Sequence, residues 1–336
     1  MPSGEMLIKL FENFKNQDEE GFTKIAFEII EEEKQKNHYL LANKLKKTLF
    51  NPNSKQISSN SCSYINNFKD LPKDKDKGTN LLEIKYTEKS FDDIFLSDDI
   101  KVKLDQILVE YNKKDILNSY NLNPKTKVLF CGPPGCGKTL CAEVLSYSLG
   151  LPILYTRFDS LISSYLGETA SNLRSVFDFA SRGNWVLFFD EFDAIGKSRD
   201  NTDEHGELKR VVNTFLQLLD NFGNDSFVIA ATNHEKLIDS ALWRRFDEVI
   251  FFDKPSSSQI EMYINMKLRS FHHKSLSINK FTNKLEGFSY ADIERICIES
   301  IKHCVLNNLD SINNDIFESE IKAEIKRSEL IKNISG

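Results

Sequence analysis

The segment Gly132-Pro133-Pro134-Gly135-Cys136-Gly137-Lys138-Thr139 has the residue types and spacing of a loop that binds phosphates. It follows the apolar run 128–131 and precedes a helical pattern that ends near Gly150. Glycines let backbone N–H groups approach phosphate oxygens, and the N-terminus of the following helix adds partial positive charge. Lys138 would reach the terminal phosphates, and the Thr139 hydroxyl would bind Mg²⁺. The segment predicts a nucleoside triphosphate site.

A second polar group ends the apolar run 185–189, where Asp190 and Glu191 follow Phe188-Phe189. A carboxylate at the carboxyl end of a strand beside a phosphate loop can hold the Mg²⁺ shell, which is the role expected of Asp190. Glu191 would then activate the attacking water. A buried strand can also end in a solvated acidic pair, but the upstream loop favours the catalytic interpretation. A water-activating glutamate favours hydrolysis over phosphoryl transfer to a metabolite.

Two further polar groups follow the next strands. Asn233 ends the run 227–231, where its amide could orient the attacking water. Arg244 and Arg245 lie on a tight turn and cannot easily reach the site of their own subunit if that site lies across the sheet. We interpret them as fingers offered to a neighbouring subunit, where they would neutralise charge in the transition state. A solvated basic turn is the alternative.

Short apolar runs alternate with amphipathic helical stretches from residue 81 onward, a pattern typical of an α/β fold with a parallel sheet sandwiched by helices. After Pro255 the strand-like runs stop and helical periodicity takes over. We therefore expect an α/β domain over 81–254 and an all-helical lid over 255–336. The expected strands are 128–131, 153–158, 185–189, 227–231 and 248–252.

Residues 1–50 predict a separate helical module of two or three short amphipathic helices, and residues 51–80 predict a polar linker. Such short helices are marginal alone, so their apolar faces must pack on one another or on a partner. A module ahead of a motor could recruit a substrate or partner. The apolar positions are Leu7, Leu10, Phe11, Phe14, Phe22, Ile25, Ala26, Ile29, Ile30, Leu41, Leu45 and Leu49.

The chain has 336 residues, of which 40% are apolar and 28% are charged, so it is long enough for about two globular domains. A formal charge of −6 disfavours a nucleic-acid-coating role. No run is long enough to cross a membrane and no signal peptide is evident, so a cytoplasmic location is expected. The six cysteines are expected to be reduced.

Other chemistries are less well supported. Cys131, Cys136 and Cys141 are evenly spaced but lack the paired hooks of a structural zinc site, which favours small buried thiols. There is no G-x-S-x-G motif, and His234-Glu235 lacks the second histidine of H-E-x-x-H. Any proteolysis would therefore need a partner protease.

Five ordered motifs together resemble the AAA ATPases proper, the clade of katanin, spastin and the proteasomal ATPases. They are GPPGCGKT (132–139), LFFDEFDA (187–194), AATN (230–233), ALWRRFD (241–247) and GFSYADIERI (287–296). The resemblance covers about residues 88–310 and implies a P-loop NTPase fold, a ring that is usually a homo-hexamer, and ATP bound between protomers.

The resemblance also implies roles for individual residues. Asn233 would be sensor 1, and Arg244 and Arg245 would reach the adjacent site. The adenine would be framed by Asp93-Ile94 and Tyr290-Ala291, although the clade commonly has Gly where this chain has Tyr290. The compact RRF form of the arginine turn is similar to katanin and spastin. The full set of expected nucleotide contacts is Asp93, Ile94, Pro134, Gly135, Cys136, Gly137, Lys138, Thr139, Leu140, Tyr290 and Ala291, with Thr139 and Asp190 toward Mg²⁺.

By the same resemblance, Tyr165 and Leu166 belong to a pore loop in which an aromatic residue from each subunit grips a threaded polypeptide. Local packing of Tyr165 under the next helix is the alternative. The polar segment 199–206 would fit a second pore loop. The expected partners are a polypeptide substrate, identical subunits and a partner protease, with no membrane and no nucleic acid.

Three functions remain open at this point. The leading one is an ATP-driven protein unfoldase or remodeller. The second is a nucleotide-dependent scaffold or switch that recruits a partner through residues 1–50 without threading. The third is a nucleic-acid motor, which the charge of −6 and the aromatic pore loop disfavour. The layout is also similar to stand-alone bacterial AAA proteins encoded beside subtilisin-like serine proteases and associated with phage defence.

Overall fold

The structure is a computed structural model that describes residues 4–15, 18–35, 71–74, 78–157, 161, 166–193, 205–223, 226–234, 240–273 and 276–335. The chain forms two compact units, residues 1–70 and 71–336. The helix expected around Leu41 to Leu49, most of the expected linker over 51–80, and the loop residue Tyr165 lie outside the described residues.

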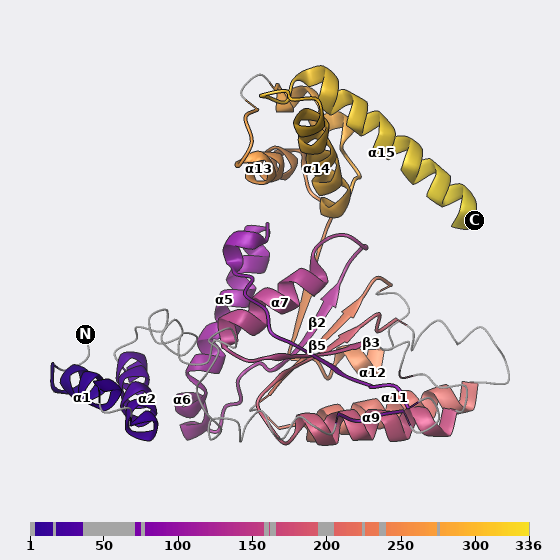
Figure 1. Cartoon of the computed structure of the whole chain (residues 1–336). Coiled ribbons are helices and arrows are strands. Elements are labelled where there is room, and N and C mark those ends of the chain that lie inside the picture. Colours follow the sequence, from indigo (N-terminus) through magenta and orange to yellow (C-terminus); the bar gives the residue numbers. More distant parts are fainter. Residues whose placement is uncertain are drawn as a thin grey trace. The chain divides into compact units, whose positions relative to one another are not determined.

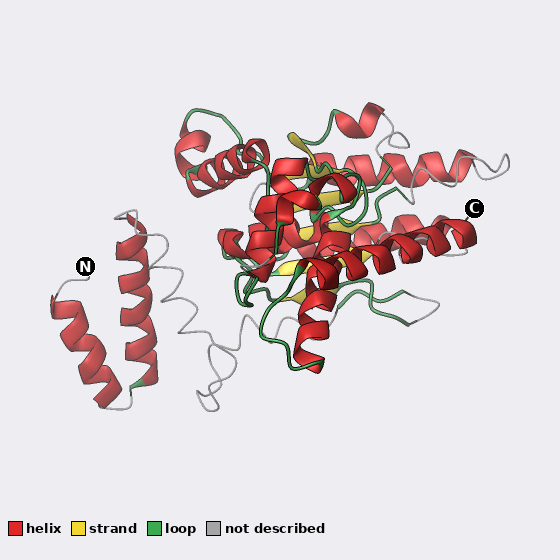
Figure 2. Ribbon diagram, turned by 90° about the horizontal axis from the view of Figure 1, so that it is seen from above, coloured by secondary structure: helices red, strands yellow, loops and turns green. Residues whose placement is uncertain are grey.

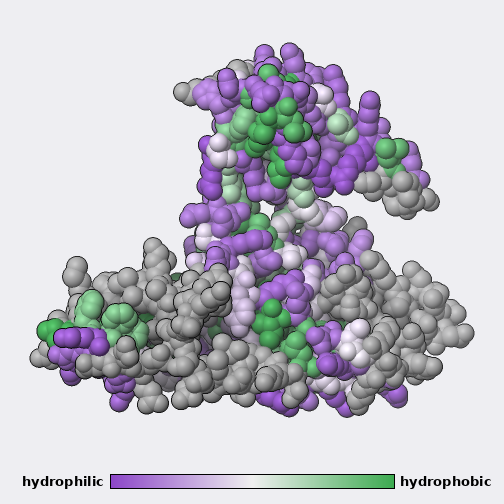
Figure 3. Space-filling view, in the orientation of Figure 1, coloured by the Kyte–Doolittle hydropathy of each residue, from purple (hydrophilic) through white to green (hydrophobic). Residues whose placement is uncertain are grey.

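The first unit contains α1 (Gly4–Lys15) and α2 (Glu19–Gln35). Asp18 caps α2, because its carboxylate accepts a hydrogen bond from the Gly21 N–H at 3.0 Å. Ile29 and Ile30 on α2 are buried, as their helical spacing predicts. By contrast, Phe11 and Phe14 on α1 are exposed by 70% and 71%. Figure 3 shows apolar side chains on the surface of this helix pair.

The second unit contains a six-stranded sheet in the order β1-β3-β4-β5-β2-β6. All neighbouring strands are parallel except β1, which pairs antiparallel with β3 at one edge. The five strands expected from the sequence are present, and every strand end lies within one residue of the expected position. The short edge strand β1 was not expected, because its three residues carry no apolar run. The bounds are β1 Glu83–Lys85, β2 Lys127–Cys131, β3 Ile153–Arg157, β4 Val186–Asp190, β5 Phe227–Thr232 and β6 Glu248–Phe251.

Helices cover both faces of the sheet, as the continuous apolar strands require. The helices α5 (Asp98–Asn112) and α7 (Lys138–Leu149) share one hydrophobic core with alternate strand residues such as Val128 and Phe130. On the other face, α9 (Leu166–Ala180) and α11 (His205–Asn221) pack aromatic rings on β4. Figure 1 shows the strands between these two helical layers, and Figure 2 shows helices lying over the strands when the molecule is seen from above. This is the α/β sandwich predicted from the sequence.

The C-terminal part is helical, as predicted, and has its own hydrophobic core. Its long helices are α13 (Ser257–Leu268), α14 (Tyr290–Leu306) and α15 (Asn314–Ser335), with two short 3-10 turns between the first two. Ser289 caps α14 in a reciprocal capping box with Asp292, which fixes where this helix begins. None of the described helices is long and apolar enough to cross a membrane.

Candidate nucleotide site

The phosphate loop connects β2 to α7, and two of its glycines are required by the space around them. Gly132 has a φ of +138°, and a Cβ added there would lie 2.1 Å from the carbonyl oxygen of Phe252 on the neighbouring chain segment. Gly135 has a φ of +74°, and a Cβ there would lie 2.6 Å from the Ser289 hydroxyl at the start of α14. A side chain at either position would therefore collide with its neighbours. The loop backbone is close-packed against both the sheet edge and the lid.

The ammonium of Lys138 lies inside this loop, where it donates to the carbonyls of Gly132 at 2.6 Å and Pro133 at 2.9 Å. The side chain is only 7% exposed. Burial lowers the pKa of Lys138, while the carboxylate of Asp190 acts in the opposite direction. The loop therefore holds a partly desolvated positive charge where the sequence predicts a phosphate contact.

The Asp190 carboxylate, at the carboxyl end of β4, accepts three hydrogen bonds. Its Oδ2 accepts hydrogen bonds from the Thr139 hydroxyl at 3.3 Å and from the Tyr155 hydroxyl at 2.8 Å. Its Oδ1 accepts the Glu191 N–H at 2.9 Å. The two residues predicted for Mg²⁺, Thr139 and Asp190, are thus in direct contact. Tyr155 was not expected there from the sequence.

Glu191 directly follows β4 and has a φ of +53°, a left-handed conformation that is unusual for a residue other than glycine. Such backbone strain persists where the surrounding structure fixes it, and it is concentrated at functional sites. The residue is exposed and lines the same pocket as Lys138 and Thr139. The turn therefore directs the predicted base away from the buried strand and toward the pocket.

Asn233 lies at the end of β5, where Asp193 connects it to β4. The buried Asp193 carboxylate accepts a hydrogen bond from the Asn233 N–H at 3.4 Å and one from the Thr232 hydroxyl at 3.5 Å. In addition, the Phe192 N–H donates to the Ala231 carbonyl at 2.9 Å. Sequence reasoning missed Asp193, although it is the third acidic residue of the LFFDEFDA motif. It holds the ends of two site strands together.

The opposite end of the pocket lies between the phosphate loop and the lid. The Ala291 N–H donates to the Gly135 carbonyl at 3.0 Å, so the start of α14 is hydrogen-bonded to the loop. Asp93 accepts hydrogen bonds from the Ser90 N–H and hydroxyl, the first of which lowers the pKa of Asp93 most. This capping box over η1 (Phe91–Asp93) presents the extended backbone of Ile94 to the pocket.

Tyr290 joins the two hydrophobic cores at this junction, since it packs against both. Its ring lies 4.9 Å from that of Tyr263 and 5.8 Å from that of Phe95. Burial raises the pKa of Tyr290 to about 12, so its phenol is neutral near pH 7. The expected Gly-Ala turn is thus replaced by an aromatic residue that fills the hinge between sheet and lid.

These residues surround a single cavity of about 390 Å³. Its lining contains all the predicted nucleotide, metal and water-activating residues: Asp93, Ile94, Pro134, Gly135, Cys136, Gly137, Lys138, Thr139, Leu140, Asp190, Glu191, Asn233, Tyr290 and Ala291. Three further lining residues were not predicted from the sequence: Phe95, Tyr263 and Glu294. Phe95 and Tyr263 carry no recognisable motif, because aromatic side chains at these spacings also fit a plain hydrophobic core. Glu294 lies inside the GFSYADIERI motif, but its position there gave it no separate role.

Arg244 and Arg245 do not line this cavity. Their turn follows α12 (Ser240–Trp243) and is anchored at the amino end of β2, because the Asp247 carboxylate accepts the N–H groups of Thr126 and Lys127, both at 2.9 Å. The phosphate loop leaves the carboxyl end of the same strand. At about 3.3 Å per residue, roughly 16 Å of strand separates the two ends.

The predicted pore-loop residues are only partly described. Leu166 is the first residue of α9 rather than part of the preceding loop, and Tyr165 lies outside the described residues. Most of the predicted second pore loop, residues 199–204, also lies outside them, while His205 and Gly206 begin α11. The gripping role of Tyr165 and Leu166 therefore stays a prediction.

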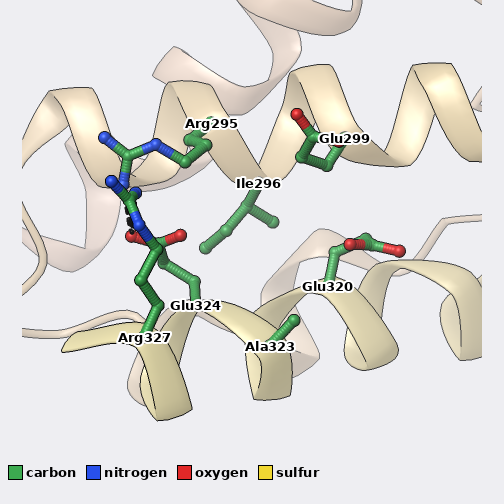
Figure 4. Close-up of a pocket in the computed structure, with 7 residues that line it drawn as sticks. All are labelled: Arg295, Ile296, Glu299, Glu320, Ala323, Glu324 and Arg327. Atoms are coloured by element: carbon green, nitrogen blue, oxygen red, sulfur yellow. Dashed lines mark hydrogen bonds and ion pairs between the residues drawn. The ribbon is translucent and has the colours of Figure 1, made fainter. Parts of the chain in front are cut away.

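A second cavity lies within the lid, between α14 and α15 (Figure 4). Arg295 and Arg327 both point at the buried carboxylate of Glu324 and form ion pairs with it. Glu299 and Glu320 also line the cavity. Because both arginines already pair with Glu324 and the other charged lining residues are acidic, this cavity does not suit a phosphate ligand.

The first cavity fits a magnesium nucleotide. Its glycine loop leaves no room for side chains, its lysine is buried against the loop, and the Thr139 hydroxyl beside the Asp190 carboxylate offers the oxygen ligands that Mg²⁺ prefers. Within the described ranges, no group of three or more His, Cys, Asp or Glu side chains could hold a metal alone. A magnesium ion here would therefore be coordinated by oxygen atoms of both the protein and the nucleotide phosphates, as is usual for this metal.

Comparison with known proteins identifies a matching family and two relatives. Residues 128–254 match the family described as ATPase family associated with various cellular activities (AAA). The chain is similar to an uncharacterized AAA family ATPase, y4kL, of Sinorhizobium fredii, with 39% identity over 331 residues that cover 97% of each chain. It is also 29% identical over 231 residues to a putative cell division cycle ATPase of Plasmodium falciparum, covering 67% of this chain and 19% of that protein.

Proposed function

Because this chain belongs to the AAA family of ATPases, we propose that it is a ring-forming motor that hydrolyses MgATP and remodels protein substrates by threading them through a central pore. The proposal is built on the chemistry of the cavity, on the position of the arginine turn, and on the resemblance of the segment around Tyr165 to a pore loop.

In this proposal, the polar side chains around the phosphate end of the cavity have defined tasks in hydrolysis. The loop N–H groups and Lys138 bind the phosphates, and Thr139 with Asp190 holds the metal. Glu191 accepts a proton from the attacking water, and Asn233 orients that water. When bound, Mg²⁺ neutralises charge that develops on the phosphate oxygens. Phe95, Tyr263 and Tyr290 close the base end of the cavity against bulk water.

The arginine turn is the observation that carries the ring proposal. Arg244 and Arg245 sit at the amino end of β2, and the cavity lies at its carboxyl end. An arginine side chain is too short to cover the roughly 16 Å of strand between them. The same turn can serve a neighbouring copy if copies are arranged head to tail, a geometry that forms a ring when the rotation between copies closes. A homo-hexamer is the ring expected from the family resemblance.

In the threading mechanism, Tyr165 and Leu166 would contact the polypeptide in the pore. The lid is hydrogen-bonded to the phosphate loop through Ala291 and Gly135, so a change at the nucleotide can be transmitted to the relative position of lid and sheet. By resemblance to stand-alone bacterial AAA proteins beside subtilisin-like proteases, the threaded product would be delivered to a partner protease in phage defence.

The second candidate is a nucleotide-dependent switch that recruits a partner through the N-terminal helices without threading. It is favoured by one observation: Ile8, Phe11 and Phe14 on α1 are exposed by 60%, 70% and 71%. Large apolar side chains grouped on one helix are typical of a docking surface. In this case the motor domain would control when the partner is held.

The test uses the Glu191→Gln protein, which should bind ATP without hydrolysing it. Light scattering with and without ATP measures the molar mass and so shows whether a ring forms. A pull-down from native lysate in the presence of ATP identifies the proteins that the variant retains. Threading predicts an ATP-dependent hexamer whose client is lost in Tyr165→Ala but kept in Tyr120→Ala, a control at a tyrosine that is 74% exposed. A monomer that retains its partner, and loses it only in Phe11→Ser/Phe14→Ser, would favour the switch instead.

A further inference from the structure

We propose that Tyr155 is a positioning residue that holds the Asp190 carboxylate in the orientation required by the metal site. Its hydroxyl donates to Asp190 Oδ2 at 2.8 Å, the shortest of the three hydrogen bonds described above for this carboxylate. The inference rests on the proposed function, because it concerns the magnesium that Asp190 would help to bind. No sequence motif assigns a role to Tyr155.

The contact follows from the register of two parallel strands. Tyr155 on β3 lies opposite Phe188 on β4, and their rings pack with centroids 5.5 Å apart. Asp190 is two residues beyond Phe188, so its side chain projects to the same face of the sheet. A tyrosine is long enough to lean past Phe188 and place its hydroxyl on Asp190. A phenylalanine at this position would keep the ring packing and lose only the hydrogen bond.

Both carboxylate oxygens of Asp190 are fixed by donors. Oδ1 accepts the Glu191 N–H, and Oδ2 accepts the hydroxyls of Tyr155 and Thr139. The Thr139 contact is longer, at 3.3 Å, and its hydroxyl oxygen is the predicted metal ligand. Tyr155 is thus the side-chain donor that can keep Asp190 oriented while Thr139 serves the metal. Outer donors of this kind orient metal-site carboxylates and tune their affinity.

The edge strand β1 supports Tyr155 from its other side. The Lys85 ammonium lies 3.8 Å from the centroid of the Tyr155 ring, a cation–π contact. A positive charge over the ring withdraws electron density from the phenol, which makes its hydroxyl a stronger hydrogen-bond donor. Glu83 of β1 pairs with Tyr155 in the antiparallel ladder, which fixes the strand that carries Lys85. This contact gives the short edge strand a role at the metal site.

Manganese binding tests the proposal without relying on turnover. In the Glu191→Gln background with ATP present, electron paramagnetic resonance measures how tightly Mn²⁺ binds. Tyr155→Phe should weaken Mn²⁺ binding roughly 10-fold, the usual effect of losing an outer-shell donor. Binding of ATP in the presence of chelator should be unchanged. Tyr111→Phe, a tyrosine that packs on Phe227 in the same core, is the matched control and should bind Mn²⁺ normally.

Lys85→Met supplies a second variant, which keeps most of the side-chain stem and removes the charge. It should weaken Mn²⁺ binding in the same direction as Tyr155→Phe but by a smaller factor. Wild-type Mn²⁺ affinity in a folded Tyr155→Phe protein would overturn the proposal. If the Glu191→Gln parent itself binds no Mn²⁺ with ATP, the proposed ATPase function fails first, and this result is distinct from equal binding in parent and variant.

Discussion

Arg245 donates from Nε to the carboxylate of Asp220 at 3.1 Å, whereas the adjacent Arg244 is exposed. Asp220 lies in the last turn of α11, so the second arginine is tied to a helix of its own subunit. The sequence presents the two arginines as equivalent. In the fold they differ, because Arg244 is exposed and Arg245 is paired with a residue of α11.

This difference predicts unequal effects in the arginine turn. Arg244→Ala should lower ATP hydrolysis about 10³-fold, at the lower end of the range for an arginine finger, while ATP binding is retained. Asp220→Asn should cause a smaller loss, because Arg245 keeps its charge and loses only its anchor. Steady-state hydrolysis and nucleotide titration measure the two quantities.

Arg182→Ala is the control for that series, since Arg182 is also exposed but lies just after α9. It should leave hydrolysis unchanged. Full hydrolysis by a dilute, demonstrably monomeric wild-type sample would contradict the shared site.

Replacement of the predicted base separates binding from hydrolysis. Glu191→Gln keeps the size and polarity of the side chain but cannot accept the proton, so hydrolysis should slow by about 10²- to 10⁴-fold. ATP affinity should stay near that of the wild type, because Lys138 and the loop backbone are intact. Hydrolysis at the wild-type rate would show that another group is the base.

The phosphate loop should tolerate no side chain at Gly132. Gly132→Ala places a Cβ 2.1 Å from the Phe252 carbonyl oxygen at a φ of +138°, so the backbone must shift. We expect a loss of about 3 kcal/mol in the free energy of unfolding, together with weaker ATP binding. Urea denaturation measures the first effect.

Gly223→Ala provides the matched control, because an added Cβ there meets no atom within 4 Å. Its free energy of unfolding should equal or slightly exceed that of the wild type. Equal stability of the two alanine variants would mean that the loop is not packed as described.

The ion pairs at the start of β6 predict that the free energy of unfolding depends on pH. Glu248 accepts hydrogen bonds from Lys103 at 2.9 Å and Lys125 at 2.8 Å. Burial raises the pKa of Glu248, but the two lysines outweigh this effect and the net pKa lies below the usual value of 4.5. The stabilisation is therefore complete above pH 4.5 and is lost as the pH falls through the lowered folded-state pKa.

At pH 7, Glu248→Gln should reduce the free energy of unfolding by about 1–2 kcal/mol, a moderate value because the lysines are partly exposed. The difference from wild type should shrink as the pH falls below the usual carboxyl pKa. Urea denaturation over a pH series gives both curves. A difference that is independent of pH would indicate lost packing rather than lost charge.

Local sequence determined much of this protein. Five of the six strands could be recognised because each is mostly a continuous apolar run, which is typical of strands buried on both faces, whereas the edge strand β1 has no such run. The phosphate loop could be recognised from the sequence because its glycines, Lys138 and Thr139 lie within one short segment, so the local backbone sets their geometry. Asp190, Glu191 and Asn233 end their strands, and the carboxyl ends of parallel strands meet at one edge.

Tertiary structure alone decided how residues from separate elements meet. Tyr155 reaches Asp190 only because β3 and β4 pair in one particular register, and Arg245 is distinguished from Arg244 only by the position of α11. Tyr290 is placed between two hydrophobic cores by the docking of α14 on the loop. Spacing along the chain encodes which face a residue occupies, whereas its contact across elements depends on strand register, helix position and side-chain length, which no local pattern specifies.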